Sequence, residues 1–108
     1  MEAGKLDGAS LRSTYQKIPV VVKSKSISFK KELFLCPKDL TCGRFMAQVR
    51  KHARALTAAE AMYLLMGEHQ QIMVPMHESI GSLDKDYANE DGYLYVYVEK
   101  EQTFGCLA

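Results

Sequence analysis

Three cysteines and three histidines are the side chains in this sequence that could act as nucleophiles, proton carriers or metal ligands. Cys36, Cys42 and Cys106 form an odd set without a Cys-x-x-Cys spacing, which argues against a disulfide framework or zinc ribbon and favours reduced thiols. Cys36 and Cys42 stand beside apolar residues, so we expect both to be small core residues. A catalytic thiol needs a His or Lys held against it, and sequence spacing alone does not establish that.

The histidines, His52, His69 and His77, show no metal-ligand spacing among themselves. We therefore expect solvated or structural histidines. The sequence predicts neither a resident metal nor a cofactor. Because no nucleophile, base and orienting group can be assembled from these residues, we expect a protein that is not itself an enzyme.

The apolar pattern predicts the elements that position these side chains. Runs of β-branched and alternating apolar residues predict strands, and recurrence every three or four residues predicts helices. Thr41 and Ser79 are the expected N-caps of the two main helices. In chain order, the pattern predicts a helix at 6–14, strands at 17–23 and 31–37 that can pair as a hairpin around a loop at 24–28, a helix at 41–54, a helical turn at 57–60, a strand at 62–66, an edge strand at 71–74, a helix at 80–87 and a strand at 93–98.

The two most apolar strands lie near opposite ends of the chain. Residues 93–98 are apolar at every position, which is typical of a strand covered on both faces, and 18–22 has the same character. We expect these two strands to be parallel neighbours at the centre of the sheet. The element order is then that of an α+β β-grasp, a mixed sheet packed on the helix at 41–54.

Length and composition are those of one folded domain: 108 residues, 47% hydrophobic and 25% charged. The longest apolar runs are far shorter than the roughly 20 residues of a membrane helix. No apolar block follows the first residue, so a secretory signal is not expected. These features predict a soluble intracellular protein.

Charge is distributed unevenly along the chain. Residues 1–54 hold 12 Lys and Arg against 4 Asp and Glu, whereas residues 55–108 hold 2 against 9. The asymmetry favours a basic and an acidic side, which either attract each other across the fold or offer a docking face to an acidic partner. Nucleic acid is the least favoured partner, because Lys30–Lys31 and Arg50–Lys51 are short clusters without an aromatic recognition motif.

Three segments carry a family resemblance: 18–22 (IPVVV), 33–51 (LFLCPKDLTCGRFMAQVRK) and 90–105 (EDGYLYVYVEKEQTFG). In order and spacing they resemble the autophagy ubiquitin-like modifiers, the family of microtubule-associated protein light chain 3 and the GABA receptor-associated protein. The resemblance implies a ubiquitin-like β-grasp over 17–101, a shortened N-terminal helical extension over 1–16 and a flexible tail over 102–108.

The resemblance also implies chemistry at Gly105, preceded by Phe104. A cysteine protease would remove the three residues after Gly105, and activating and conjugating enzymes would pass the new carboxylate to phosphatidylethanolamine. The chain would then be cytoplasmic, with a lipid-anchored pool on autophagosomal membranes. Two alternatives stay open, namely a peptide-binding module that is never conjugated and a modifier joined to protein lysines.

The second implied function is the binding of receptor peptides with an aromatic-x-x-aliphatic motif along an exposed sheet edge. Tubulin is a further partner that the resemblance suggests. Leu33 stands where relatives often have lysine, and Gln48 replaces an aliphatic residue. Carried over by position, the aromatic pocket comprises Asp7, Leu11, Pro19, Val21, Leu35 and Tyr93, the aliphatic pocket comprises Phe34, Cys36, Pro37, Leu40 and Phe45, and Lys17, Lys30, Lys31 and Leu33 flank them, with Lys30 and Lys31 placed to attract acidic residues.

Overall fold

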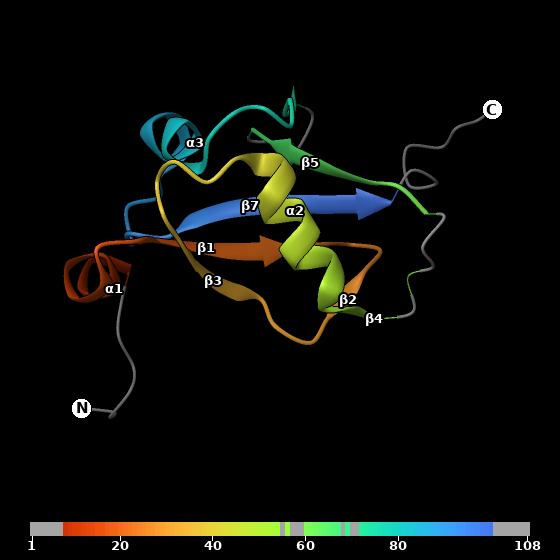
Figure 1. Ribbon diagram of the computed structural model, residues 1–108, viewed down its shortest axis with the longest axis horizontal. Helices are drawn as coiled ribbons and strands as arrows, with labels where there is room; N and C mark the ends of the chain where they lie inside the picture. The colour runs from red at the N-terminus through yellow and green to blue at the C-terminus, as the bar shows by residue number, and fades with distance from the viewer. Residues whose placement is uncertain (1–7, 55, 57–59, 68, 70–71, 101–108) are drawn as a thin grey trace.

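The computed structural model describes residues 8–54, 56, 60–67, 69 and 72–100 (Figure 1). The described part forms a five-stranded sheet in the order β3-β1-β7-β5-β6 and a two-stranded sheet of β2 and β4. None of its helices has the length and apolar character needed to cross a bilayer. The elements are α1 (Gly8–Tyr15), β1 (Ile18–Lys23), β2 (Ser28–Phe29), β3 (Leu33–Cys36), α2 (Cys42–Lys51), β4 (Ala53–Arg54), β5 (Met62–Met66), β6 (Ile72–Met73), α3 (Ile80–Tyr87) and β7 (Leu94–Lys100).

Strands β1 and β7 are parallel neighbours at the sheet centre, as the sequence predicts. Val20 is opposite Leu94, and Val22 is opposite Val96. Strand β3 pairs antiparallel with β1, and β5 pairs antiparallel with β7 (Figure 1). The sheet is therefore mixed, and its two central strands come from opposite ends of the chain.

Helix α2 crosses one face of this sheet and forms the core with it (Figure 1). Phe45 and Val49 point inward from the helix and are almost inaccessible to solvent. Thr41 caps the helix, because its Oγ1 accepts a hydrogen bond from the Arg44 N–H. The periodicity at 41–54 thus predicts the apolar face of α2 correctly.

Only one face of β7 is fully covered. Leu94, Val96 and Val98 are completely buried, whereas Tyr95 and Tyr97 on the opposite face are half-buried. The expectation that both faces of this strand are covered is therefore wrong. A tyrosine ring can pack on a sheet while its hydroxyl reaches water, so a run that reads as continuously apolar can still border solvent.

The helix expected at 41–54 ends earlier than its sequence pattern. It stops at Lys51, and residues 53–54 form strand β4, which pairs with β2. Strand β2 begins at Ser28, the last residue of the segment 24–28 that is expected as a loop. Phe29 is opposite Ala53 in this pair. The turn expected at 57–60 falls largely on residues 57–59, which lie outside the described part of the chain.

The remaining elements agree with the predictions to within about two residues. Helix α3 has the predicted bounds, and the Ser79 Oγ caps it by accepting a hydrogen bond from the Ser82 N–H. Strand β6 lies at the sheet edge, as predicted for 71–74. Helix α1 starts at Gly8, within the segment predicted to be helical at 6–14.

Helix α1 approaches the loop before β7 very closely. The Gly8 N–H donates a 3.1 Å hydrogen bond to the Asp91 carbonyl. A Cβ added to Gly8 would lie 2.3 Å from the Gly92 carbonyl carbon, and Gly92 itself has a φ of +89°. Gly8 therefore requires glycine because of the close contact, and Gly92 requires it because of that contact and its left-handed backbone.

Candidate functional site

Strand β3 is an edge of the five-stranded sheet. Within the described part of the chain it pairs with β1 alone, so its other edge has no strand beside it. An edge strand presents N–H and C=O groups to which an extended peptide can pair. The segment that the resemblance assigns to peptide docking therefore lies where a strand can be added (Figure 1).

The side chains of β3 alternate between the two faces of the sheet. Phe34 and Cys36 are buried on the face that α2 covers, while Leu33 is exposed and Leu35 half-buried on the other face. A peptide strand added to β3 alternates in the same way. Its residues three positions apart therefore face opposite sides of the sheet.

The outer face gathers the residues of the expected aromatic pocket. Pro19 on β1 is opposite Leu35, and Val21, two residue pairs further along, is opposite Leu33. Val21, Leu35 and Tyr93 are half-buried, so each leaves apolar surface open. Leu11 of α1 is buried although it is not part of the core cluster between the sheet and α2.

The inner face holds the residues of the expected aliphatic pocket. The Phe34 ring meets the Phe45 ring edge-on at 5.6 Å and the His52 ring at the same centroid distance. Phe34, Cys36 and Phe45 all belong to the buried core. The burial of Cys36 confirms its predicted core position, whereas the sequence predicts His52 only as solvated or structural.

The accessible rim of the inner pocket comes from the segment after β3. Pro37 is exposed, and Leu40 is half-buried and packs against the core. Gln48, on α2, is exposed. An aliphatic anchor would first meet this rim, with the phenylalanine rings beneath it.

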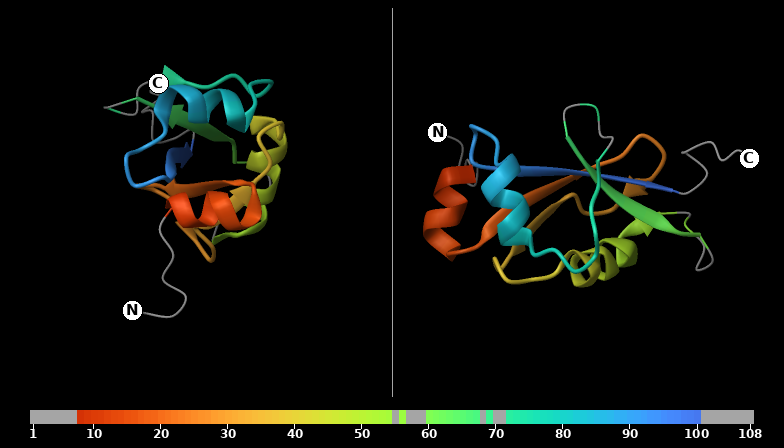
Figure 2. Two further views of the ribbon diagram at one scale, coloured as in Figure 1. Left: turned by 90° about the vertical axis from the view of Figure 1, so that its left-hand side faces the viewer. Right: turned by 90° about the horizontal axis from the view of Figure 1, so that it is seen from above.

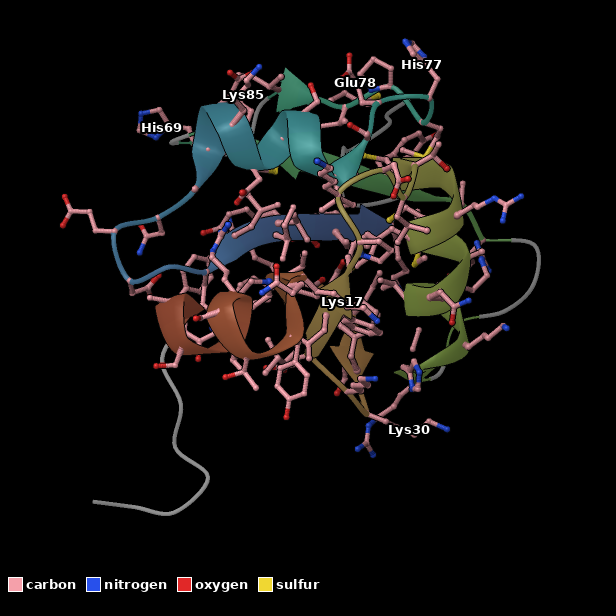
Figure 3. The ribbon with its side chains drawn as sticks, turned by 60° about the vertical axis from the view of Figure 1, so that its left-hand side comes forward. Lys17, Lys30, His69, His77, Glu78 and Lys85 are labelled. Atoms are coloured by element: carbon pink, nitrogen blue, oxygen red, sulfur yellow. The ribbon has the colours of Figure 1, made fainter. Side chains whose placement is uncertain are left out.

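Basic side chains flank the edge strand. Lys17, Lys30 and Lys31 are exposed, and the Lys31 ammonium lies 4.9 Å from the Phe34 ring centroid. Figure 3 shows Lys30 at the opposite end of the view from His77 and Lys85. The Lys30 N–H donates a 2.8 Å hydrogen bond to the His52 carbonyl, so Lys30 lies beside the end of α2.

The two described cysteines are buried and protonated. Burial raises the pKa of Cys36 to about 12, although nearby lysines oppose the shift, and burial raises the pKa of Cys42 to about 11. A thiol with such a pKa carries almost no thiolate at neutral pH. Among the described residues, no three His, Cys, Asp or Glu side chains come together as a metal site would require.

Some predicted site residues cannot be placed. Asp7, Phe104 and Gly105 lie outside the described residues, as do the processing site and the whole tail at 102–108. Their roles stay predictions from the resemblance.

Sequence reasoning missed one pair of residues next to the site. Arg12 of α1 donates hydrogen bonds of 2.7 and 2.6 Å to the two carboxylate oxygens of Asp84 on α3, and its Nε donates to the Gly92 carbonyl at 2.7 Å. Arg12 neighbours Leu11 on the helix. Because 72 residues separate Arg12 from Asp84, no local sequence pattern signals the contact.

Comparisons with known proteins agree with this architecture. The family model described as autophagy protein Atg8, ubiquitin-like, matches residues 4–105. Autophagy-related protein 8 of Dictyostelium discoideum is 34% identical over 88% of this chain and 80% of that protein. Human microtubule-associated protein 1 light chain 3 gamma is 34% identical over 92% of this chain and 69% of that protein. The crystal structure of Trypanosoma brucei ATG8 matches with a TM-score of 0.75 and 25% identity, over 87% of this chain and 82% of that one.

Proposed function

Because the chain belongs to the Atg8 family of autophagy ubiquitin-like proteins, we propose that it is a modifier processed to Gly105, joined to phosphatidylethanolamine, and able to recruit receptors along β3. In this role the chain is a substrate of the conjugation enzymes and not an enzyme. It would be cytoplasmic until it is conjugated and would then be anchored to autophagosomal membranes.

One geometric observation supports peptide docking most strongly. The open edge strand β3 separates two apolar residue sets, one on each face of the sheet. Anchors three positions apart on an added strand face opposite sides, so an aromatic-x-x-aliphatic peptide matches both sets at once. Lys30 and Lys31 would attract acidic residues that precede the aromatic anchor.

Conjugation at Gly105 is supported by sequence position. The family match ends at this residue, and β7 ends at Lys100, shortly before it. Hydrolysis of the bond after Gly105 would free its carboxylate, which ATP would adenylate with release of pyrophosphate. An enzyme cysteine would then displace AMP to form a thioester, and the lipid amine would displace that cysteine to form an amide. Glycine suits these steps because it has no Cβ to obstruct a narrow catalytic cleft.

The conjugation proposal is tested by intact mass. The full chain is incubated with the family's processing protease, its activating and conjugating enzymes, ATP, and liposomes containing phosphatidylethanolamine. We expect loss of the last three residues followed by a mass increase equal to one lipid minus water, and neither step in Gly105→Ala. A protein-sized adduct would instead support the lysine-conjugated alternative, and an unchanged chain would support the unconjugated binding module.

The docking proposal is tested independently by titrating the isotope-labelled chain with an aromatic-x-x-aliphatic peptide. We expect amide shifts around 30–40, Val21 and Tyr93, with an affinity that is roughly micromolar for so small an interface. Shifts clustered at 69–77 would show that the groove is on the other side of the molecule.

We propose microtubule binding as a second candidate function, because the human relative is named as a microtubule-associated protein. The basic N-terminal half of the chain is suited to the acidic surface of tubulin. Co-sedimentation with microtubules that weakens as salt increases would support it. Absence of co-sedimentation at low salt would exclude it.

A further inference from the structure

We infer that Arg12 and Asp84 are positioning residues of the β3 groove, because their ion pair fixes α1 where Leu11 closes the pocket for the aromatic anchor. The inference rests on the proposed docking of peptides along β3. It assigns a role in that docking to α3, which carries none of the residues expected to line the groove.

The ion pair constrains the guanidinium of Arg12 from two directions. Asp84 accepts two hydrogen bonds from the Nη atoms, and the Gly92 carbonyl accepts one from Nε. The side chains of Arg12 and Asp84 are 30% and 17% exposed, so water screens the pair only in part. A two-point charge-assisted contact of this kind fixes orientation as well as distance.

Helix α1 has few other attachments to α3. A hollow of about 670 Å³ lies between the two helices, and Arg12 and Asp84 are both in its wall. Figure 2 shows the helices at the same end of the molecule. Apolar packing between them is therefore limited at this point, and the ion pair bridges them.

The length of α1 makes its position dependent on such contacts. It has eight residues, too few for a stable isolated helix. Besides the ion pair, it is held by Leu11, which is buried outside the main core, and by the close contact of Gly8 with Gly92. Rotation of α1 about its Gly8 end would displace Leu11 together with Arg12.

Displacement of Leu11 affects one half of the groove. Val21, Leu35 and Tyr93 are half-buried on the outer face. Helix α1, which carries the buried Leu11, packs on β1 and therefore borders this face. The inner set around Phe34 lies on the other side of β3. Loss of the ion pair should therefore weaken recognition of the aromatic anchor and leave the aliphatic anchor unaffected.

The test is a double-mutant cycle between protein and peptide, measured by titration of the full chain. One peptide carries the aromatic-x-x-aliphatic motif, and a second carries Ala in place of the aromatic residue. We expect Asp84→Asn to lower the affinity for the first peptide about fivefold and to leave the affinity for the second almost unchanged. Asp86→Asn, an exposed carboxylate on the same helix, is the matched control and should leave both affinities unchanged.

Restoring the ion pair with exchanged charges distinguishes a positioning role of Arg12 and Asp84 from a general loss of stability. Arg12→Asp combined with Asp84→Arg restores the ion pair with reversed polarity and should recover part of the affinity for the aromatic peptide. Arg12→Lys, which keeps the charge but loses the two-point contact, should behave like Asp84→Asn. Circular dichroism and thermal melts verify that each variant is folded at the titration temperature.

The outcomes distinguish the two proposals. If wild type binds the aromatic peptide and Asp84→Asn binds it equally well, or loses the same factor with both peptides, the positioning role is wrong while docking stands. If wild type binds neither peptide, the proposed docking fails and the positioning role fails with it.

Discussion

Glu99 of β7 accepts a 2.6 Å hydrogen bond from the Ser26 hydroxyl, across a separation of 73 residues. The same carboxylate accepts hydrogen bonds from the Ser24 hydroxyl and from the backbone N–H groups of Lys25 and Ser26. Glu99 is only 6% exposed. One carboxylate thus accepts hydrogen bonds from two hydroxyls and two backbone N–H groups of the turn that follows β1.

Glu99→Gln should lower the free energy of unfolding by about 2 kcal/mol, because the amide has one acceptor oxygen where four donors converge. Urea denaturation followed by circular dichroism measures the change. Glu90→Gln, at an exposed carboxylate in the loop before β7, is the control and should be near neutral. Equal stability of the two variants would contradict the role of Glu99.

Val96→Asp should lower the free energy of unfolding by about 4 kcal/mol or more, because it places an unpaired charge at a completely buried position of the central strand. The thermal midpoint reports the effect. Met73→Asp, at an apolar position on β6 that is 53% exposed, should change stability by less than about 0.5 kcal/mol. An unchanged midpoint for Val96→Asp would show that β7 is not in the core.

The hydrogen bond between Tyr95 and Asp91 should be visible in their titrations. The Tyr95 hydroxyl donates to Asp91 Oδ2 at 2.6 Å, which raises the pKa of Tyr95 to about 12 and lowers the pKa of Asp91. The tyrosine contribution to stability is complete below its ordinary pKa and is lost as pH rises through about 12. The aspartate contribution is present above its ordinary pKa and is lost as pH falls through its lowered value.

Asp91→Ala should therefore move the Tyr95 pKa down toward the ordinary tyrosine value of about 10. Ring-carbon NMR shifts followed from neutral to high pH measure this, with Glu90→Ala as the control. The loss in free energy of unfolding caused by Asp91→Ala should also be smaller in acid than at neutral pH. A Tyr95 titration that is the same in wild type and Asp91→Ala would show that the bond does not form.

Cys36 and Cys42 should resist alkylation in the native chain at neutral pH. Both are buried, and burial raises their pKa values to about 12 and about 11. Iodoacetamide treatment followed by peptide mass mapping should find them modified slowly, and rapidly once guanidinium unfolds the chain. Fast stoichiometric labelling of either residue in the folded protein would contradict this burial.

The double variant Lys30→Ala, Lys31→Ala should bind an aromatic-x-x-aliphatic peptide with acidic flanking residues about threefold more weakly at low salt. At high salt the affinity should hardly change, because screening removes the charge contribution. Lys85→Ala, at an exposed lysine on α3 far from Lys30 in Figure 3, is the matched control. Peptide titrations at two ionic strengths measure the difference. A salt-independent loss would show that the lysines act through packing.

Leu35→Asp should abolish peptide binding at any salt, because it puts a charge into the apolar surface of the outer face. Leu35 is half-buried, so circular dichroism must first show the native fold. Leu33→Asp, on the same face but more exposed, should have a smaller effect. Binding that persists in Leu35→Asp would exclude the outer face as the site of the aromatic anchor.

The sequence by itself determined the elements whose signals are local. Helical spacing of Phe45 and Val49, the caps Thr41 and Ser79, and the β-branched run at 18–22 all depend on residues within a few positions of one another. The two most apolar strands could also be placed at the sheet centre, because such strands need neighbours on both sides. The family resemblance added the expected groove and its residues.

The tertiary structure alone decided what depends on distant residues. Strand β4 replaces the last turn of the expected helix because β2 offers it a partner, and Tyr95 and Tyr97 of β7 are only half-buried on the face opposite Val96. Arg12 meets Asp84, and Ser26 meets Glu99, across more than 70 residues. Local propensity carries no information about such pairs, because hydrogen bonding and burial select them only after the sheet has brought their elements together.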